Sequence, residues 1–553
     1  MSAETAALSI SSPTSPTPPP YLHDSPTIAS SPPHPHPNTR YIGILHTGQS
    51  LSDGVSGDIR TPLPSLPYAL KLHDSTNSYD LTADPNATSD TLSLVQLSEP
   101  IRPILKGARE WPENIEGVTP AEGFARQVDK LAAERDEEGK IITVHSVVGR
   151  AGEGMVGIKK GGIINSYAAS LWEARAIRRL LGPDAEFSYD VILLTHGETD
   201  SWRENAGYMD EVVQLQKDYA VDLKEITGQT HAPFMLVTQQ HTCVPLAGKI
   251  PLGIQTQWRV QAASEGRVVC VGPKYQYGYA EDLLHMPAGG YRRLGEKYAQ
   301  VWDVLRRGRQ WKPLSPRKMT REDDKIRVEM DVMFPPLRWD DHLPRPHQTG
   351  KFAAWQYGRG FEVRDGGAVG NVSIAKAEIE GENVILHLSD PQPAADAKLV
   401  VSYAMTPDED GCNGGRGNGR IGHLCDSDPF KSASPLEIEV ELVKGERAFQ
   451  GGDEMLALYN LVTPGDYVLT EFDATKPDRG GLSRPWEGES GKHKLTFGHN
   501  QANYCVSFIG RVDDRPWENP FEGIEECKVS SQTNEAQSAK EEVVEKEEKP
   551  AAA

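Results

Sequence analysis

Five short runs rich in Ile, Val and Leu alternate with helical patterns between about residues 40 and 310, and this alternation constrains the fold more than any other feature. The runs predict strands at 41–46, 141–147, 191–195, 234–238 and 268–271, and the helical patterns lie at 121–137, 166–182, 208–226 and 289–307. Near-continuous apolar runs are typical of strands that are buried on both faces. The sequence therefore predicts an α/β fold with a parallel, flavodoxin-like sheet of five strands.

The second half of the chain has a different pattern. From about residue 315, apolar and polar residues alternate with a period of two, and Gly, Asp and Pro turns separate the runs. This pattern predicts a β-sandwich-like region, in one or two parts. We expect an α/β domain at 39–312, a β-rich region at 315–525, and disordered tails at 1–38 and 526–553. The segment 52–118 is predicted as an insertion, and either a lid over the site or plain surface elaboration would explain it.

Composition excludes some classes of partner. The chain of 553 residues carries 58 basic and 79 acidic residues, a formal net charge of −21, which argues against nucleic acid and against anionic membrane surfaces. No apolar run approaches the roughly 18 residues that a membrane span needs. The N-terminus lacks the pattern of a secretory signal, so we expect a cytoplasmic protein in which Cys412 and Cys425 are free thiols. The sequence does not predict an oligomeric state.

Three polar segments follow predicted strands. Gly48-Gln49-Ser50 follows the first strand, the GETD segment at 197–200 follows the third, and Asp282 and His285 follow the fifth. Because the carboxyl ends of parallel strands meet at one edge of a sheet, we expect these segments to converge. A Ser hydroxyl needs a base such as His, and an Asp can orient that His. Ser52 is the alternative hydroxyl.

With these segments the chain resembles the SGNH hydrolase superfamily, in the branch that contains sialate O-acetylesterases and related carbohydrate acetylesterases. That branch carries a GQS sequence, a GE-x-D sequence and a D-x-x-H sequence followed by a helix of the type found here as "AGGYRRLGEKYA". The resemblance covers about residues 40–305. It implies that Ser50 is the nucleophile, His285 the general base and Asp282 the residue that orients His285.

The resemblance also implies an oxyanion hole, which would comprise the N–H groups of Ser50 and Gly152 and a polar group in the third segment. Gly149 is the alternative to Gly152. Many SGNH enzymes have Asn at the position of Thr199, so the third donor stays open. Gln49 and Glu198 are possible site-lining residues, and Glu198 could instead cap a helix.

The function predicted on this basis is hydrolysis of acetyl or short acyl esters, on a carbohydrate or another small ester substrate, through an acyl-enzyme. The alternative is an inactive SGNH-fold module that binds glycan or protein. No cofactor and no metal are predicted. The sequence "WDDH" at 339–342 indicates a solvated turn, and the glycine-rich stretch at 411–427 lacks the GK-S/T ending of a phosphate-binding loop.

Overall fold

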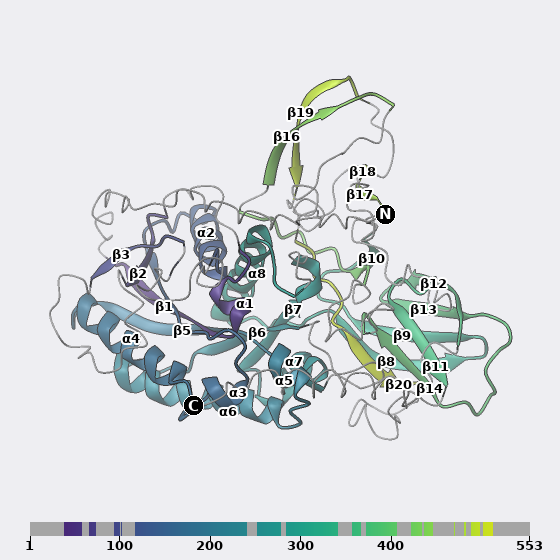
Figure 1. Cartoon of the computed structure of the whole chain (residues 1–553), viewed down its shortest axis with the longest axis horizontal. Coiled ribbons are helices and arrows are strands. Elements are labelled where there is room, and N and C mark those ends of the chain that lie inside the picture. Colours follow the sequence, from purple (N-terminus) through teal and green to yellow (C-terminus); the bar gives the residue numbers. More distant parts are fainter. Residues whose placement is uncertain are drawn as a thin grey trace, which may run out of the picture.

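The chain forms an α/β layer and a neighbouring β-sandwich (Figure 1). The structure is a computed structural model, and it describes residues 38–57, 66–72, 93–99, 101, 117–240, 252–277, 284–340, 357–365, 372–405, 422–433, 436–445, 469–470, 481–482, 488–497 and 501–512. Apart from Asn38, both predicted tails lie outside these residues.

The main sheet contains the five predicted strands and two more. Its order is β3-β2-β4-β1-β5-β6-β7. The pairs β2–β4, β4–β1, β1–β5, β5–β6 and β6–β7 are parallel, whereas β3 is antiparallel to β2. The strands are β1 Arg40–Gly48, β2 Ala69–Leu72, β3 Leu94–Gln96, β4 Ile141–Val147, β5 Glu186–Thr195, β6 Phe234–Gln239 and β7 Val268–Pro273. The flavodoxin-like α/β fold is thus confirmed, and the described part of the 52–118 segment extends its sheet by β2 and β3.

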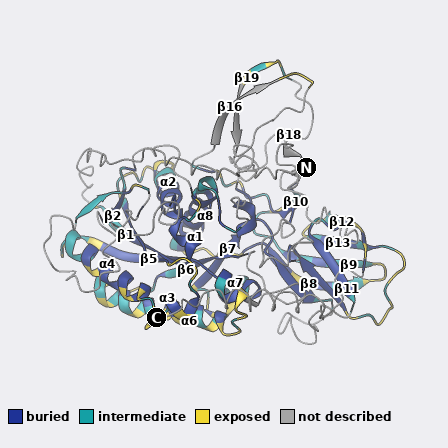
Figure 2. Ribbon diagram, viewed as in Figure 1, coloured by how far each residue is buried: buried dark blue, intermediate teal, exposed yellow. Residues whose placement is uncertain are grey.

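Helices cover both faces of this sheet (Figure 1). The helices are α1 Ser50–Asp53, α2 Pro120–Ala133, α3 Met155–Ile158, α4 Ser166–Leu181, α5 Glu198–Trp202, α6 Tyr208–Thr227, α7 Leu252–Ala263 and α8 Ala288–Arg306, with a 3-10 turn, η2, at Lys274–Tyr277. Along β5, Val191 and Leu193 pack with α2 and α8, while Ile192 and Leu194 pack with α4 and α6. This two-sided burial, visible as the dark central strands of Figure 2, explains why the strand sequences are apolar at consecutive positions.

Two antiparallel sheets form the sandwich. One has the order β12-β13-β9-β8 and the other β11-β14-β20. Their strands are β8 Ser315–Glu322, β9 Lys325–Asp331, β11 Phe361–Asp365, β12 Ile374–Glu380, β13 Asn383–Leu388, β14 Leu399–Tyr403 and β20 Phe508–Arg511. Val328 and Leu386 from the first sheet share one core with Val401 and Phe508 from the second. The predicted β-sandwich is therefore present, and β20, from the end of the β-rich region, completes it.

Short strand pairs are the other strands described in the β-rich region. They are β10 Arg338–Trp339 with β15 Leu424–Cys425, β16 Leu436–Leu442 with β19 Gly491–Phe497, and β17 Leu469–Thr470 with β18 Gly481–Leu482. The pair β16–β19 projects away from both domains in Figure 1.

The predictions for the "WDDH" sequence and for Cys425 concern residues in or next to these short strands. Asp340 is 1% exposed and accepts a hydrogen bond from the Tyr504 hydroxyl, so the prediction of a solvated turn was wrong at this residue. Cys425 is a buried free thiol in a strand, whereas Cys412 lies outside the described residues.

Backbone-to-amide hydrogen bonds join the two domains. The Gln239 side chain donates to Ser507 O at 2.8 Å and accepts from Ser507 N at 2.8 Å. Gln255 on α7 accepts from Ile509 N at 3.1 Å, and Ile254 packs with Ile509. Because two buried amides are matched to the backbone of the β20 segment, the sandwich is held in one position against α7 and β6.

A buried histidine pair lies below the carboxyl edge of the sheet. His46 on β1 and His145 on β4 are each 1% exposed, with 3.2 Å between His46 Nε2 and His145 Nδ1. His145 Nε2 lies 2.9 Å from Thr143 Oγ1. Burial lowers the pKa of His46 to about 3, and burial and the charge of His46 lower the pKa of His145. Both rings are therefore neutral at physiological pH.

Acid is expected to weaken the fold through this pair. In the unfolded chain His46 is protonated below its ordinary pKa of 6.5, whereas in the folded protein it stays neutral down to about pH 3. Because the unfolded state binds the extra proton, the free energy of unfolding falls with falling pH. Between pH 6 and 4, His46→Gln should remove about 1.4 kcal/mol of this loss per pH unit. Urea unfolding of both proteins across this range measures the difference. Identical pH slopes would contradict the prediction.

Candidate active site

The three predicted segments lie at the carboxyl edge of the main sheet. Gly48 ends β1, and Ser50 begins α1 directly after it. Glu198 begins α5, three residues after the last residue of β5. His285 lies between η2 and α8, after β7. The described side chains Ser50, Glu198 and His285 therefore lie at one edge of the sheet, as expected from the strands that they follow.

A tight turn presents Ser50. Gly48 lies opposite Thr195 of β5 and has φ +140°, and a Cβ there would overlap the Thr195 carbonyl. Gln49 is extended and its N–H donates to Thr195 O at 3.3 Å. Only a glycine tolerates both this φ and this close approach. Ser50 consequently lies just beyond the point where β1 and β5 end beside each other.

Ser50 and His285 are hydrogen-bonded to each other. The distance between Ser50 Oγ and His285 Nε2 is 2.7 Å, and the two residues are 7% and 9% exposed. In this geometry the imidazole can accept the hydroxyl proton. Asp282, predicted to orient His285, lies outside the described residues.

The alternative hydroxyl, Ser52, has other partners. Its Oγ lies 2.7 Å from Gln49 O and 3.2 Å from Asp53 Oδ1. A Cβ on Gly149 would overlap this Oγ, so the loop after β4 packs directly against it. Ser52 therefore fixes the turn at α1, and Gly149 is required to be small because it contacts that turn.

Hydrogen bonds connect Thr199 to both neighbouring segments. Thr199 Oγ1 donates to Gly152 O at 3.1 Å, and Thr199 N donates to Gln49 Oε1 at 3.5 Å. Gly152 is exposed, has φ +75° and has open space around a would-be Cβ. The Thr199 hydroxyl donates its hydrogen to Gly152 O, and it would have to break this bond to donate to an oxyanion. Its role as the third oxyanion donor stays a prediction.

Two more side chains hold the loop that contains Gly152. Asp200 Oδ2 accepts from Met155 N at 2.8 Å, and His196 Nε2 lies 3.1 Å from Glu153 O. Burial lowers the pKa of His196, so the ring is neutral and donates from Nε2 to this carbonyl. Together with Thr199, these contacts fix the backbone from 152 to 155. The sequence signal for Asp200 was the GE-x-D segment, whereas His196 was not recognised.

Glu198 forms an ion pair rather than a helix cap. Its Oε1 accepts from Lys274 Nζ at 3.1 Å, and the two side chains are 1% and 0% exposed. Gly197, not Glu198, is the residue before α5. Lys274 was missed at the sequence level because a lone Lys after a strand is ordinarily solvated.

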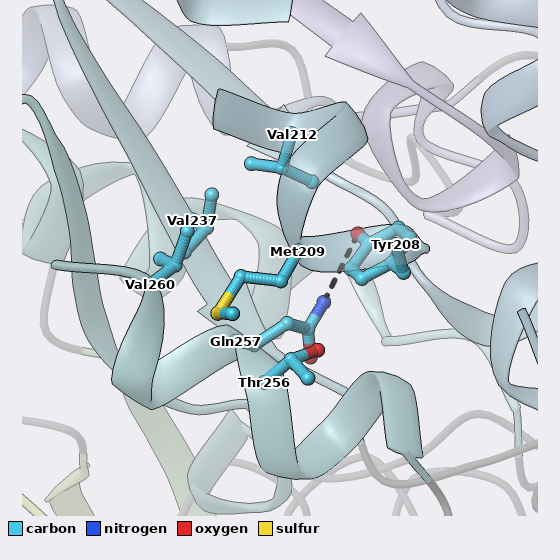
Figure 3. A pocket seen from close by; sticks show the side chains of 7 residues that line it. All are labelled: Tyr208, Met209, Val212, Val237, Thr256, Gln257 and Val260. Atoms are coloured by element: carbon cyan, nitrogen blue, oxygen red, sulfur yellow. Dashed lines mark hydrogen bonds between the residues drawn. The ribbon is translucent and has the colours of Figure 1, made fainter. Parts of the chain in front are cut away.

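A small, mostly apolar pocket lies between α6 and α7 (Figure 3). Its lining residues are Tyr208, Met209, Val212, Val237, Thr256, Gln257 and Val260. Gln257 Nε2 donates to His196 O at 2.6 Å and lies 3.4 Å from the Tyr208 hydroxyl, which contacts the His196 ring. Neither Ser50 nor His285 lines this pocket, so the pocket is separate from the candidate site. Its lining residues Gln257 and Tyr208 contact His196.

Two features are absent from the described residues. No group of three or more His, Cys, Asp or Glu side chains in the described ranges is arranged to hold a metal ion. No helix within those ranges is long and apolar enough to cross a membrane.

Comparison with known proteins gives distant structural matches. No protein-family model and no curated protein matches the chain. The chain is similar to a carbohydrate acetylesterase from Xanthomonas citri, at 12% identity and a TM-score of 0.42, over 69% of this chain and 77% of that one. It is also similar to NanS (11%, TM-score 0.32, 49% and 99%) and to a carbohydrate acetylesterase from Sinorhizobium meliloti (12%, 0.26, 48% and 99%). Values this low carry no argument about chemistry.

Removal of the Asp200 charge is expected to loosen the loop at 152–155. Met155 N and the Asn205 side-chain amide each donate a hydrogen bond to one oxygen of the Asp200 carboxylate. In Asp200→Asn an NH₂ group replaces one of these oxygens and faces one of the two donors. The free energy of unfolding should fall by about 1–3 kcal/mol. Denaturant unfolding measures this loss, with the exposed Asp184→Asn as the matched control. Equal stability of the two variants would show that the loop does not depend on Asp200.

Proposed function

We propose that this chain is a serine esterase of the SGNH type that hydrolyses acetyl or short acyl esters through an acyl-enzyme. The observation that carries the proposal is the 2.7 Å hydrogen bond between Ser50 Oγ and His285 Nε2. A neutral imidazole at this distance can remove the hydroxyl proton as the oxygen attacks a carbonyl carbon.

In the first half of the reaction, Ser50 Oγ bonds to the acyl carbon while His285 takes the proton. The carbonyl becomes an oxyanion, which needs fixed N–H donors. Among the described residues, no acceptor is bonded to the backbone N–H of Ser50 or of Gly152. These two groups are accordingly available as donors, and the contacts of Thr199 and Asp200 hold Gly152 in place.

In the second half, His285 returns the proton to the leaving alcohol, and the ester bond to the substrate breaks. Water then attacks the acyl-enzyme with His285 again as the base, which releases the acid and regenerates Ser50. Asp282 would hold the ring of His285 in the tautomer that this cycle requires.

The substrate we propose is an acylated carbohydrate, on the basis of the GQS, GE-x-D and D-x-x-H resemblance.

Loss of either reacting group should abolish turnover. Ser50→Ala and His285→Ala are each expected to lower kcat for a chromogenic acetyl ester by about 10⁴-fold or more, because each removes a member of one proton-transfer unit. Ser52→Ala, the matched control, should keep its rate within about tenfold, since the described hydrogen bonds of Ser52 Oγ are to Gln49 O and Asp53 Oδ1 and not to His285.

The same assay separates the competing explanations. Turnover that survives both Ser50→Ala and His285→Ala would overturn the esterase assignment. An inactive Ser52→Ala protein beside an active Ser50→Ala protein would show that the other hydroxyl reacts. A full chain that binds an acetylated glycan, hydrolyses no ester and resists a fluorophosphonate probe at Ser50 would be the inactive binding module.

A further inference from the structure

Lys274 is a buried cation beside the candidate site. It is the first residue of η2 and follows the last residue of β7, Pro273. Its side chain is 0% exposed. A fully buried ammonium is rare because removal from water is expensive, so its partners show what it does.

The described partners of Lys274 belong to two different segments of the site. Nζ donates to Glu198 Oε1 at 3.1 Å and to Leu284 O at 3.0 Å. Glu198 immediately precedes Thr199, which is bonded to Gly152. Leu284 immediately precedes His285. One ammonium therefore joins the segment after β5 to the segment that carries the imidazole.

The bond to Leu284 O acts on His285 through covalent geometry. The Leu284 carbonyl and the His285 N–H belong to one planar peptide unit. Fixing the carbonyl oxygen fixes that plane, and with it the position of the His285 Cα from which the ring extends. A ring displaced by about 1 Å would no longer meet Ser50 Oγ correctly, and such displacements can reduce rates by about 100-fold.

Stability alone is a weak explanation for this ion pair. Buried pairs often contribute little net stability relative to apolar side chains. The second oxygen of Glu198, Oε2, is buried without a described partner, so the pair is not optimised for hydrogen bonding. Another buried lysine, Lys297, differs from Lys274 in its partners. It binds Asp428, Gln501 O and Asn503 in the β-rich region, and these partners belong to none of the site segments.

We propose that Lys274 is a positioning residue, whose ammonium holds the Leu284 carbonyl and thereby fixes the His285 ring against Ser50, with Glu198 holding the ammonium. The proposal rests on the proposed esterase function. It gives Glu198 a role in the site that involves no contact with substrate.

The test removes both charges together, because a single deletion would leave a buried unpaired charge. Glu198→Gln/Lys274→Met is compared with Lys297→Met/Asp428→Asn, an equally buried pair away from the site. Thermal unfolding and steady-state hydrolysis of a chromogenic acetyl ester are measured for both. We expect the first variant to lose about 10- to 100-fold in kcat with KM within about threefold. The control should lose stability and keep its kcat.

Three outcomes would overturn the positioning role: an unchanged kcat in the folded Glu198→Gln/Lys274→Met protein, equal losses in the two double variants, or a change in KM alone. Activity that survives Ser50→Ala would instead overturn the esterase function, so the two failures are distinguishable. If the first double variant does not fold, Glu198→Gln should keep a higher kcat than Glu198→Ala, since only the amide can still accept from Lys274. Equal kcat values for those two folded proteins would also overturn the role.

Discussion

The site depends on the register between β1 and β5. Gly43 pairs with Tyr189 and Ile44 with Val191, so β5 contains one extra residue, Asp190, at this point. Without the shift, Gly48 would lie opposite Leu194 rather than Thr195. The bulge therefore brings the ends of the two strands level, and the turns that follow them emerge side by side. All contacts between the Ser50 turn and the segment after β5 follow from this alignment.

The segment after β5 organises the rest of the site from one short helix. Thr199 and Asp200 reach the loop after β4, and Glu198 reaches Lys274 after β7. Consecutive residues of a helix point in different directions, so one turn can serve several neighbours. The dense connections explain why this segment carries polar residues that are almost entirely buried. A segment fixed in this way suits the oxyanion site proposed above, because such donors must be held in place before the reaction.

The sequence predicted those features that repeat or that end a strand. Two-sided burial makes the five central strands apolar throughout, and their shared carboxyl edge predicts that Ser50 and His285 lie close together. Strands β2 and β3 were missed because they are short and lie within a polar segment. Helix α7 was missed because "LGIQTQWRVQAA" combines Gly, Gln and β-branched residues without a clear apolar face. Lys274 depends on partners that are distant in sequence, which no local pattern encodes.

The place of β20 in the sandwich has a consequence for biosynthesis. Strand β14 pairs with β11 on one side and obtains its second neighbour only when residues 508–511 have been made. Gln239 and Gln255 bind the backbone of that same segment. While the ribosome is still translating the β-rich region, the amides on β6 and α7 lack these partners. The α/β domain therefore completes its own surface only after the β20 segment has been made. A completed parallel sheet is thus not yet the native structure, because two of its buried amides still await the β20 segment.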